Sequence, residues 1–275
     1  MRNKKKQANN RGVALIIVLL VTALLIALVF EFAYGTRVSL RAAVNFRNSQ
    51  RAYFLARSGL GYFAKYPELR DFIEQRDCKP LPYVSEGDRE VVLCWEDESG
   101  KIDISQVNTA DQQRFNRQTN LFFNRGVDQK VLTDISLWMT ENRVNRFSLL
   151  SELHQFMKDE EFGKVKDFLT VSQPAKINVN TASLDVLKSV FQSVGYSGGA
   201  AESIAEKRTA EPFTETTLQS YLTMNSLSNV SSAVTTTSDL FKVNLFATVG
   251  GFTRHIEAIV RLSGPAYTVN YWREF

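Results

Sequence analysis

Residues 11–30 read RGVALIIVLLVTALLIALVF, and this apolar run sets the plan of the chain. All eighteen positions from Val13 to Phe30 are uncharged, and Thr22 is the only polar one. A helix of about 20 apolar residues crosses the hydrocarbon core of a bilayer. A secretory signal peptide has a shorter apolar core of about 7–15 residues and an A-x-A-like cleavage site, which does not clearly follow here. We therefore expect an uncleaved membrane span or a special leader.

Basic residues precede the apolar run. Residues 1–11 carry five Lys or Arg side chains and no acidic one, which predicts a cytoplasmic N-terminus and a body outside the membrane. The 275-residue chain has 33 basic and 29 acidic residues, a net charge of +4. Without residues 1–11, 28 basic residues face 29 acidic ones. The body is therefore not basic, which argues against nucleic acid as a partner.

The helix is predicted to continue beyond the membrane. No proline occurs from Gly35 to Tyr66, and Pro67 marks the expected end. A helix over 13–66 has 54 residues and a length of about 80 Å. Uncharged residues recur in it at spacings of four and three, as on one helical face: Ala42, Phe46, Ser49, Tyr53, Ala56, Leu60 and Phe63. This stripe is predicted to pack on the protein's own sheet or on partner helices, and the sequence leaves both open.

The body alternates between strand and helix patterns. Two strands are predicted at Arg89–Trp95 and Lys101–Ser105, with a turn at Ser99-Gly100. Helical patterns follow over 109–123, 128–142, 148–157, 159–170, 181–194, 199–208 and 216–222. Thr109 and Thr181 are the expected N-caps of the first and fifth of these. Residues 225–238 read as a loop or linker, and further strands are predicted over 240–249, 252–262 and 267–272. Strands, then helices, then strands indicate an α+β protein with an inserted helical domain.

Two cysteines, Cys78 and Cys94, follow the apolar run. In an oxidising compartment they can pair, and the closed loop would contribute roughly 3 kcal/mol by chain entropy. The alternative is one exposed and one buried thiol.

The start of the chain resembles a known family. Residues 11–16, Arg-Gly-Val-Ala-Leu-Ile, are similar to the leader of type IV pilins and pseudopilins. The resemblance implies that a prepilin peptidase cuts between Gly12 and Val13 and methylates Val13. The fifth mature position is then Ile17, where most members have a Glu that neutralises the amino terminus of a neighbouring subunit. Absence of this Glu suits a subunit at a filament end and is typical of the K-type minor pseudopilins of type II secretion.

Further motifs resemble K-type pseudopilins in the family's order. They are the aromatic segment Gln50–Tyr62, the hairpin-like Trp95–Asn108, the helix start Ser148–Leu153 and the closing strand Tyr267–Arg273. The box "I-N-V-N-T-A" is present as Ile177, Asn178, Val179, Asn180, Thr181 and Ala182. The resemblance implies a pilin-like fold, in which a long helix packs on a small antiparallel sheet, with an inserted all-α domain of the SAM or helix-hairpin-helix kind.

The resemblance also implies an organisation and a function. The expected parts are a leader (1–12), a transmembrane helix (13–34), its periplasmic continuation (35–66), an α+β head (67–106 and 239–275) and a helical insert (107–238). The implied function is that of an inner-membrane, single-pass minor pseudopilin at the periplasmic pseudopilus tip, which initiates assembly and limits growth. Its implied partners are the I- and J-type minor pseudopilins, the prepilin peptidase and the inner-membrane secretion platform. A minor pilin of a type IV pilus is an alternative of the same class.

No cofactor is expected. Some K-type pseudopilins have an acidic stretch associated with calcium, and this stretch is missing between Asn142 and Ser148. Four carboxylates gather near the predicted turn instead: Glu96, Asp97, Glu98 and Asp103. Since Ca²⁺ takes six to eight oxygen ligands, we interpret these as a solvated hairpin end rather than a metal site.

A DNA-binding module is the main rival interpretation. The "I-N-V-N-T-A" box also begins helix-hairpin-helix modules, and Val194–Ala200 followed by Arg208 would be the phosphate-binding hairpin. A membrane-anchored DNA-uptake receptor is thus the alternative function, although Lys176–Arg208 has a net charge of only +1. We do not expect an enzyme, because common catalytic motifs are absent and the only histidines, His154 and His255, are predicted to lie on a helix face and a sheet surface.

Overall fold

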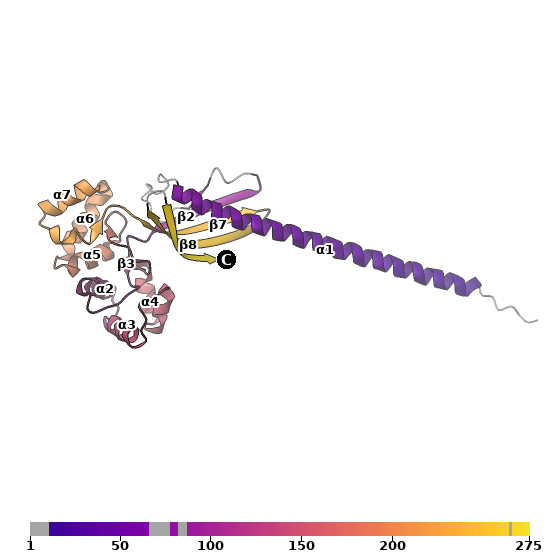
Figure 1. The fold of residues 1–275 in the computed structure, drawn as a ribbon, viewed down its shortest axis with the longest axis horizontal. Coiled ribbons are helices and arrows are strands. Elements are labelled where there is room, and N and C mark those ends of the chain that lie inside the picture. The colour runs from indigo at the N-terminus through magenta and orange to yellow at the C-terminus, as the bar shows by residue number, and fades with distance from the viewer. Residues whose placement is uncertain (1–10, 66–77, 82–86, 264–265) are drawn as a thin grey trace, which may run out of the picture.

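The computed structural model of the chain describes residues 11–65, 78–81, 87–263 and 266–275. Helix α1 (Arg11–Lys65) is one continuous helix of 55 residues, as the absence of proline predicts. It extends from the body as a long rod, and only its last turns lie on the sheet (Figure 1). The basic residues before position 11 and the predicted helix end at Pro67 lie outside the described residues.

A five-stranded antiparallel sheet supports the end of α1. Its order is β1 (Cys78–Pro80), β2 (Arg89–Asp97), β7 (Leu240–Val249), β8 (Phe252–Ser263) and β9 (Ala266–Glu274). Strands β7 and β8 have nearly the bounds that the sequence predicts, because both alternate between buried and exposed residues and Gly250-Gly251 forms the turn. Strand β1, with only three residues, is not among the strands that the sequence predicts.

Helix and sheet share one apolar core. Its members include Leu60 and Phe63 from α1, Leu93 from β2, Leu245 from β7 and Ile256 from β8. The close approach of helix and sheet depends on Gly59. A Cβ atom at that position would lie 2.8 Å from Cδ2 of Leu245, whereas one at Gly61 would meet nothing within 4 Å.

The predicted hairpin after β2 is wrong. Only Ile102–Asp103 (β3) is extended, and it pairs in parallel with β4 (Leu169–Thr170), not with β2. The reason is packing, because Ile102 and Ile104 are buried in the core of the helical region rather than beside the sheet. The chain therefore leaves the sheet after Asp97 and does not return until β7.

The helical region lies between β2 and β7 in sequence and has a core of its own, which runs from Ile102 to Val234. Its α-helices are α2 (Gln112–Asn124), α3 (Lys130–Glu141), α4 (Asp159–Val165), α5 (Leu184–Ser193), α6 (Gly198–Ala210) and α7 (Glu215–Met224). Short 3-10 helices cover Leu150–Gln155, Lys166–Phe168 and Ser228–Val230. Two short parallel strands, β5 (Ile177–Asn178) and β6 (Val234–Thr235), pair the middle of the region with its C-terminal end.

Two local predictions in this region, both of N-caps, are wrong. The N-cap of α2 is Asp111, whose carboxylate accepts a hydrogen bond from the Arg114 amide, so the cap is not Thr109. The N-cap of α5 is Ser183 and not Thr181, which has a different partner described below. Residues 225–238 form mostly a loop, as one of the two predictions had it, and this loop packs on the helical core, because Val230, Ala233 and Val234 are buried and β6 lies within it.

Candidate functional site

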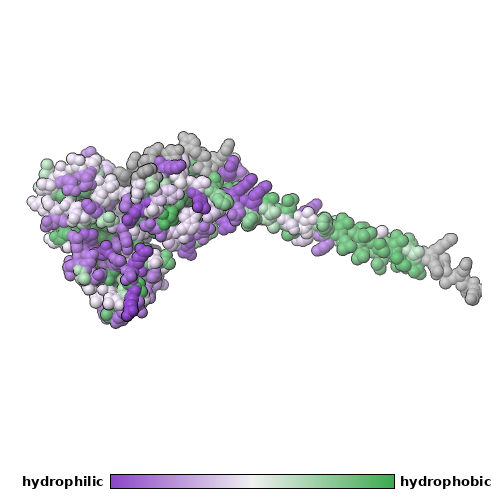
Figure 2. All heavy atoms as spheres, in the orientation of Figure 1, coloured by the Kyte–Doolittle hydropathy of each residue, from purple (hydrophilic) through white to green (hydrophobic). Residues whose placement is uncertain are grey.

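The apolar part of α1 is exposed along its length. In the part of the chain that the structure describes, α1 is the one helix long and apolar enough to cross a membrane, and none of its most apolar window is buried by protein. Figure 2 shows this end of the rod as a largely hydrophobic surface. Gly12 and Val13, the predicted processing site, lie in the first turn of α1, and Ile17 follows on its exposed surface. Such a surface fits a membrane anchor.

The uncharged stripe of α1 divides into two parts. Ala56, Leu60 and Phe63 are buried on the sheet, and Tyr53 is half-buried beside them. Ala42 and Phe46 lie beyond the sheet and are exposed, Phe46 by 69%. The stripe from Tyr53 to Phe63 therefore packs on the protein's own sheet, as one of the two predictions had it, whereas Ala42 and Phe46 stay exposed. Contact of this exposed part with partner helices remains a prediction.

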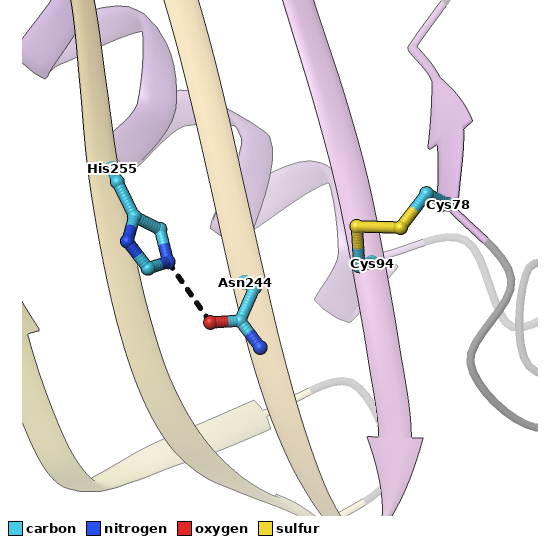
Figure 3. The surroundings of a disulfide bond; sticks show 4 residues. All are labelled: Cys78, Cys94, Asn244 and His255. Atoms are coloured by element: carbon cyan, nitrogen blue, oxygen red, sulfur yellow. Dashed lines mark hydrogen bonds between the residues drawn. A yellow bond between two sulfur atoms is a disulfide. The ribbon is translucent and has the colours of Figure 1, made fainter.

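A disulfide joins the edge strand β1 to its neighbour β2. Cys78 of β1 lies directly opposite Cys94 of β2, and their sulfur atoms are 2.05 Å apart (Figure 3). Leu93 and Trp95, on either side of Cys94, are buried beneath α1, so Cys94 faces away from the helix. The bond holds the three-residue strand β1 against the sheet.

Asp97 is the centre of the junction between sheet and helical region. It is the last residue of β2, and its carboxylate accepts hydrogen bonds from the Ser99 amide at 2.7 Å and the Asn178 side chain at 3.3 Å. The hydroxyls of Thr181 and Ser238 also donate to it. Burial raises the pKa of Asp97, and the hydrogen bonds from Ser238, Thr181 and Ser99 oppose that rise. Two members of the "I-N-V-N-T-A" box thus bind the end of a sheet strand.

The other members of the box hold the helical region together. The Asn180 side chain both donates to the carbonyl and accepts from the amide of Phe213, each at 2.9 Å. Arg208 donates to the carbonyls of Val179 and Ala182. Ile177, Val179 and Ala182 are buried in the helical core. The box is therefore a structural junction, and Arg208, the candidate phosphate ligand, points into the protein.

A second contact crosses the junction from β8. The Arg261 guanidinium donates to the backbone carbonyl of Gln173 at 2.7 Å and to that of Ser172 at 3.3 Å. Neither Arg261 nor Ser238 was singled out from the sequence, because their partners lie far away in the chain and no local pattern marks them.

The sequence predicts that four carboxylates form a solvated hairpin end: Glu96, Asp97, Glu98 and Asp103. The structure contradicts this prediction. Asp97, Glu98 and Asp103 are all less than 10% exposed. Glu96 and Glu98 both form ion pairs with Lys101, at 3.0 and 2.7 Å. Asp103 accepts from the Ser105 amide at 2.9 Å.

These carboxylates also do not fit calcium. The described residues contain no group of three or more His, Cys, Asp or Glu side chains that could hold a metal ion. Ca²⁺ needs six to eight oxygens, whereas Glu96 and Glu98 pair with Lys101, and Asp97 and Asp103 accept hydrogen bonds from backbone amides.

Both histidines have ordinary structural partners. His154 lies 3.0 Å from the Asp159 carboxylate. His255 bonds the Asn244 side chain at 2.9 Å, on the sheet near the disulfide (Figure 3). Its ring stacks between Phe246 and Phe275, and burial lowers its pKa. Both histidines lie on the elements that the sequence predicts, His154 in a helical segment and His255 on a strand of the sheet.

Comparison with known proteins gives one kind of match. No protein-family model and no curated protein matches this sequence. Among solved structures, a chain of the GspK-GspI-GspJ complex from the type 2 secretion system of enterotoxigenic Escherichia coli is similar, with a TM-score of 0.51 and 16% sequence identity. The match covers 87% of this chain and 99% of that chain. Most of this chain thus shares its fold with a chain of that secretion complex.

Proposed function

We propose that this chain is a K-type minor pseudopilin of a type II secretion system. One observation carries the proposal: a single unbroken helix first presents an entirely exposed apolar surface and then packs its end on an antiparallel sheet. A helix of this kind anchors a head to a membrane and leaves a free segment between the two for neighbouring subunits. The fold shared with a chain of the GspK-GspI-GspJ complex supports the same assignment.

In this proposal the chain is processed at its N-terminus. A prepilin peptidase cuts after Gly12 and methylates Val13, and the mature protein remains in the inner membrane with its head in the periplasm. Ile17 then occupies the fifth position and cannot neutralise the amino terminus of a neighbour. A subunit without that carboxylate is better placed at the filament tip, where it initiates assembly and limits growth, than within the shaft.

The proposed partners are the I- and J-type minor pseudopilins. The exposed segment of α1 around Ala42 and Phe46 is the surface that we assign to their helices, because the protein's own sheet leaves it uncovered. The sheet with the end of α1 would form the head, and the helical region between β2 and β7 would provide bulk at the tip. We propose no catalytic activity and no cofactor.

The mature N-terminus tests this proposal. Mass spectrometry of the chain isolated from membranes that contain the matching prepilin peptidase is expected to find methylated Val13 as the first residue. The Gly12→Leu variant is expected to stay at precursor length and to abolish secretion. An intact start at Met1 or Arg2 in the wild-type protein would contradict the pilin-like pathway. Loss of surface pili with normal secretion in a deletion strain would instead assign the chain to a type IV pilus.

A further inference from the structure

A cationic segment of α1 follows the apolar run. Residues 32–65 carry six basic side chains and no acidic one. Four of the basic residues are exposed and lie within an arc of about 120° on the helix: Arg37, Arg41, Arg47 and Arg51. Within the part of the chain that the structure describes, none of these four has an ion-pair partner. This face of α1 is therefore a cationic surface that is open to an anionic partner, and Figure 2 shows hydrophilic groups directly beyond the hydrophobic end of the rod.

Aromatic residues at the end of the apolar run set the depth of α1 in a bilayer. Phe30, Phe32 and Tyr34 are exposed by 72%, 77% and 70%. Tyrosine is enriched where the hydrocarbon core meets the headgroups, because its ring is apolar and its hydroxyl is polar. We therefore place Tyr34 at the headgroup level, with the apolar residues before it in the hydrocarbon.

Two of the four arginines then lie within reach of the headgroups. At about 1.5 Å per residue, Arg37 lies about 4.5 Å beyond Tyr34, and Arg41 lies about 10 Å beyond it. Side chains on an α-helix lean toward the helix N-terminus, so both guanidinium groups extend back toward the membrane. Their spacing of four residues also places them on the same side of α1, where their like charges repel each other unless an anion lies between them.

The other two arginines lie too far from the membrane for this contact. Arg47 and Arg51 are about 20 and 26 Å beyond Tyr34. The headgroup layer on each side of the hydrocarbon core is only about 5–8 Å thick. The two pairs thus have the same charge, spacing and exposure, and they differ in their distance from the lipid.

Lipid phosphates are the anions that suit the first pair. A guanidinium group binds a phosphate through two parallel hydrogen bonds. Phosphates are present at this depth wherever α1 crosses a bilayer, whereas an acidic protein segment would have to be brought there. Because no acidic residue accompanies the two arginines, they favour lipids with a net negative charge over lipids whose own ammonium group balances the phosphate.

We infer that Arg37 and Arg41 bind the phosphates of acidic phospholipids in the leaflet next to the head. This contact holds Tyr34 at the membrane surface and so fixes how far α1 projects from the bilayer. The inference requires that α1 spans a membrane, and it does not depend on assignment to a secretion system.

The test uses the full chain in phosphatidylcholine vesicles with a reporter tryptophan, introduced by Phe30→Trp. Phe30 lies two helical turns before Arg37, on the same face and within the apolar run. Phosphatidylglycerol or phosphatidylcholine with brominated acyl chains is then added, because bromine quenches tryptophan on contact. The native tryptophans lie in β2, α3 and β9, away from the lipid, and give a constant background. Residues 1–11 lie at the opposite end of the span, so their basic side chains do not affect the reporter.

Phosphatidylglycerol should be enriched about fivefold over phosphatidylcholine near the reporter, as expected for an arginine close to a membrane surface. Arg37→Gln combined with Arg41→Gln should remove this enrichment. Arg37→Lys combined with Arg41→Lys keeps the charge and should stay within about twofold of wild type. Arg47→Gln combined with Arg51→Gln is the matched control, and it should also stay within about twofold of wild type.

A blue-shifted reporter emission and an unchanged circular dichroism spectrum will show that each variant is inserted and helical. Equal enrichment in wild type and in the Arg37→Gln, Arg41→Gln protein would overturn the inference and leave an acidic protein segment as the occupant. An equal loss in the Arg47→Gln, Arg51→Gln protein would also overturn it, because the effect would then depend on the overall charge of α1. No enrichment in wild type at low salt would overturn it as well.

Discussion

The carboxylate of Asp97 accepts a hydrogen bond from the hydroxyl of Thr181, across 84 residues of sequence. Asp97 ends a strand of the sheet, and Thr181 belongs to the box that begins the second half of the helical region. Ser238, just before the chain returns to β7, donates to the same carboxylate. One buried side chain therefore joins the point where the chain leaves the sheet to the point where it comes back. The position of the helical region relative to the sheet therefore depends on the Asp97 side chain.

The Asp97→Asn variant should lose about 1–3 kcal/mol of unfolding free energy. An amide has one acceptor oxygen and turns its own N–H groups toward the donors of Thr181, Ser238 and Asn178. Chemical denaturation of the full chain in detergent measures the loss. Asp159→Asn is the matched control, because the Asp159 side chain is 96% exposed and its partner is His154. Equal stability of the two variants would contradict a structural role for Asp97.

Asp97 also predicts a direction of pH dependence. Burial raises its pKa above the ordinary 3.8. Between the ordinary and the raised pKa, the folded protein holds a proton that the unfolded chain has released, so this group makes stability fall as pH rises through that window. Below the ordinary pKa the contribution is constant. From about pH 4 upward, the unfolding free energy of Asp97→Asn should therefore fall less steeply with pH than that of the wild type. An identical slope of unfolding free energy against pH in both proteins would contradict the raised pKa of Asp97.

The sequence predicted the parts with strong local signals. Strands β7 and β8 follow from alternation around Gly250-Gly251, and α1 follows from an apolar run without proline. The prediction of a hairpin was wrong because alternation at Ile102–Ile104 indicates only that the strand has a buried face. It does not indicate which strand is the neighbour. Thr181 is a good N-cap residue, but tertiary contact with Asp97 takes its hydroxyl, and Ser183 caps instead.

Gly59→Ala should destabilise the head by about 1–3 kcal/mol through overpacking. Its new methyl group would meet Leu245 at 2.8 Å and Leu81 and Val91 at 3.3 Å. Gly61→Ala is the control in the same turn of α1, where the space is open, and it should stabilise the helix by up to about 1 kcal/mol. Thermal unfolding of both variants separates steric contact from helix propensity. A stabilised Gly59→Ala protein would show that α1 does not approach the sheet this closely.

Removal of the disulfide should cost about 3 kcal/mol, since Cys78 and Cys94 are separated by 16 positions. Cys78→Ser and Cys94→Ser should each give this loss, and the double variant should give no more than either alone. Denaturation with and without reductant provides the comparison, because reductant should destabilise only wild type. Additive losses in the double variant would mean that the two sulfurs are not bonded to each other.

Arg208 distinguishes a structural box from a DNA-binding one. Its guanidinium donates to the carbonyls of Val179 and Ala182 through one nitrogen, and burial lowers its pKa, so it is already committed inside the protein. Arg208→Lys should lower the unfolding free energy by about 1–3 kcal/mol, because the lysine side chain is one bond shorter and its ammonium does not reach the position of the guanidinium nitrogen that binds both carbonyls. Arg146→Lys, at an exposed position, should have little effect.

In gel-shift experiments at low salt neither wild type nor the Arg208→Lys variant should move duplex DNA. The structural interpretation of the box would be wrong if the wild type shifted duplex DNA, the shift weakened as salt rose, and a folded Arg208→Lys protein gave no shift. Loss of affinity with rising salt is typical of contacts to phosphates.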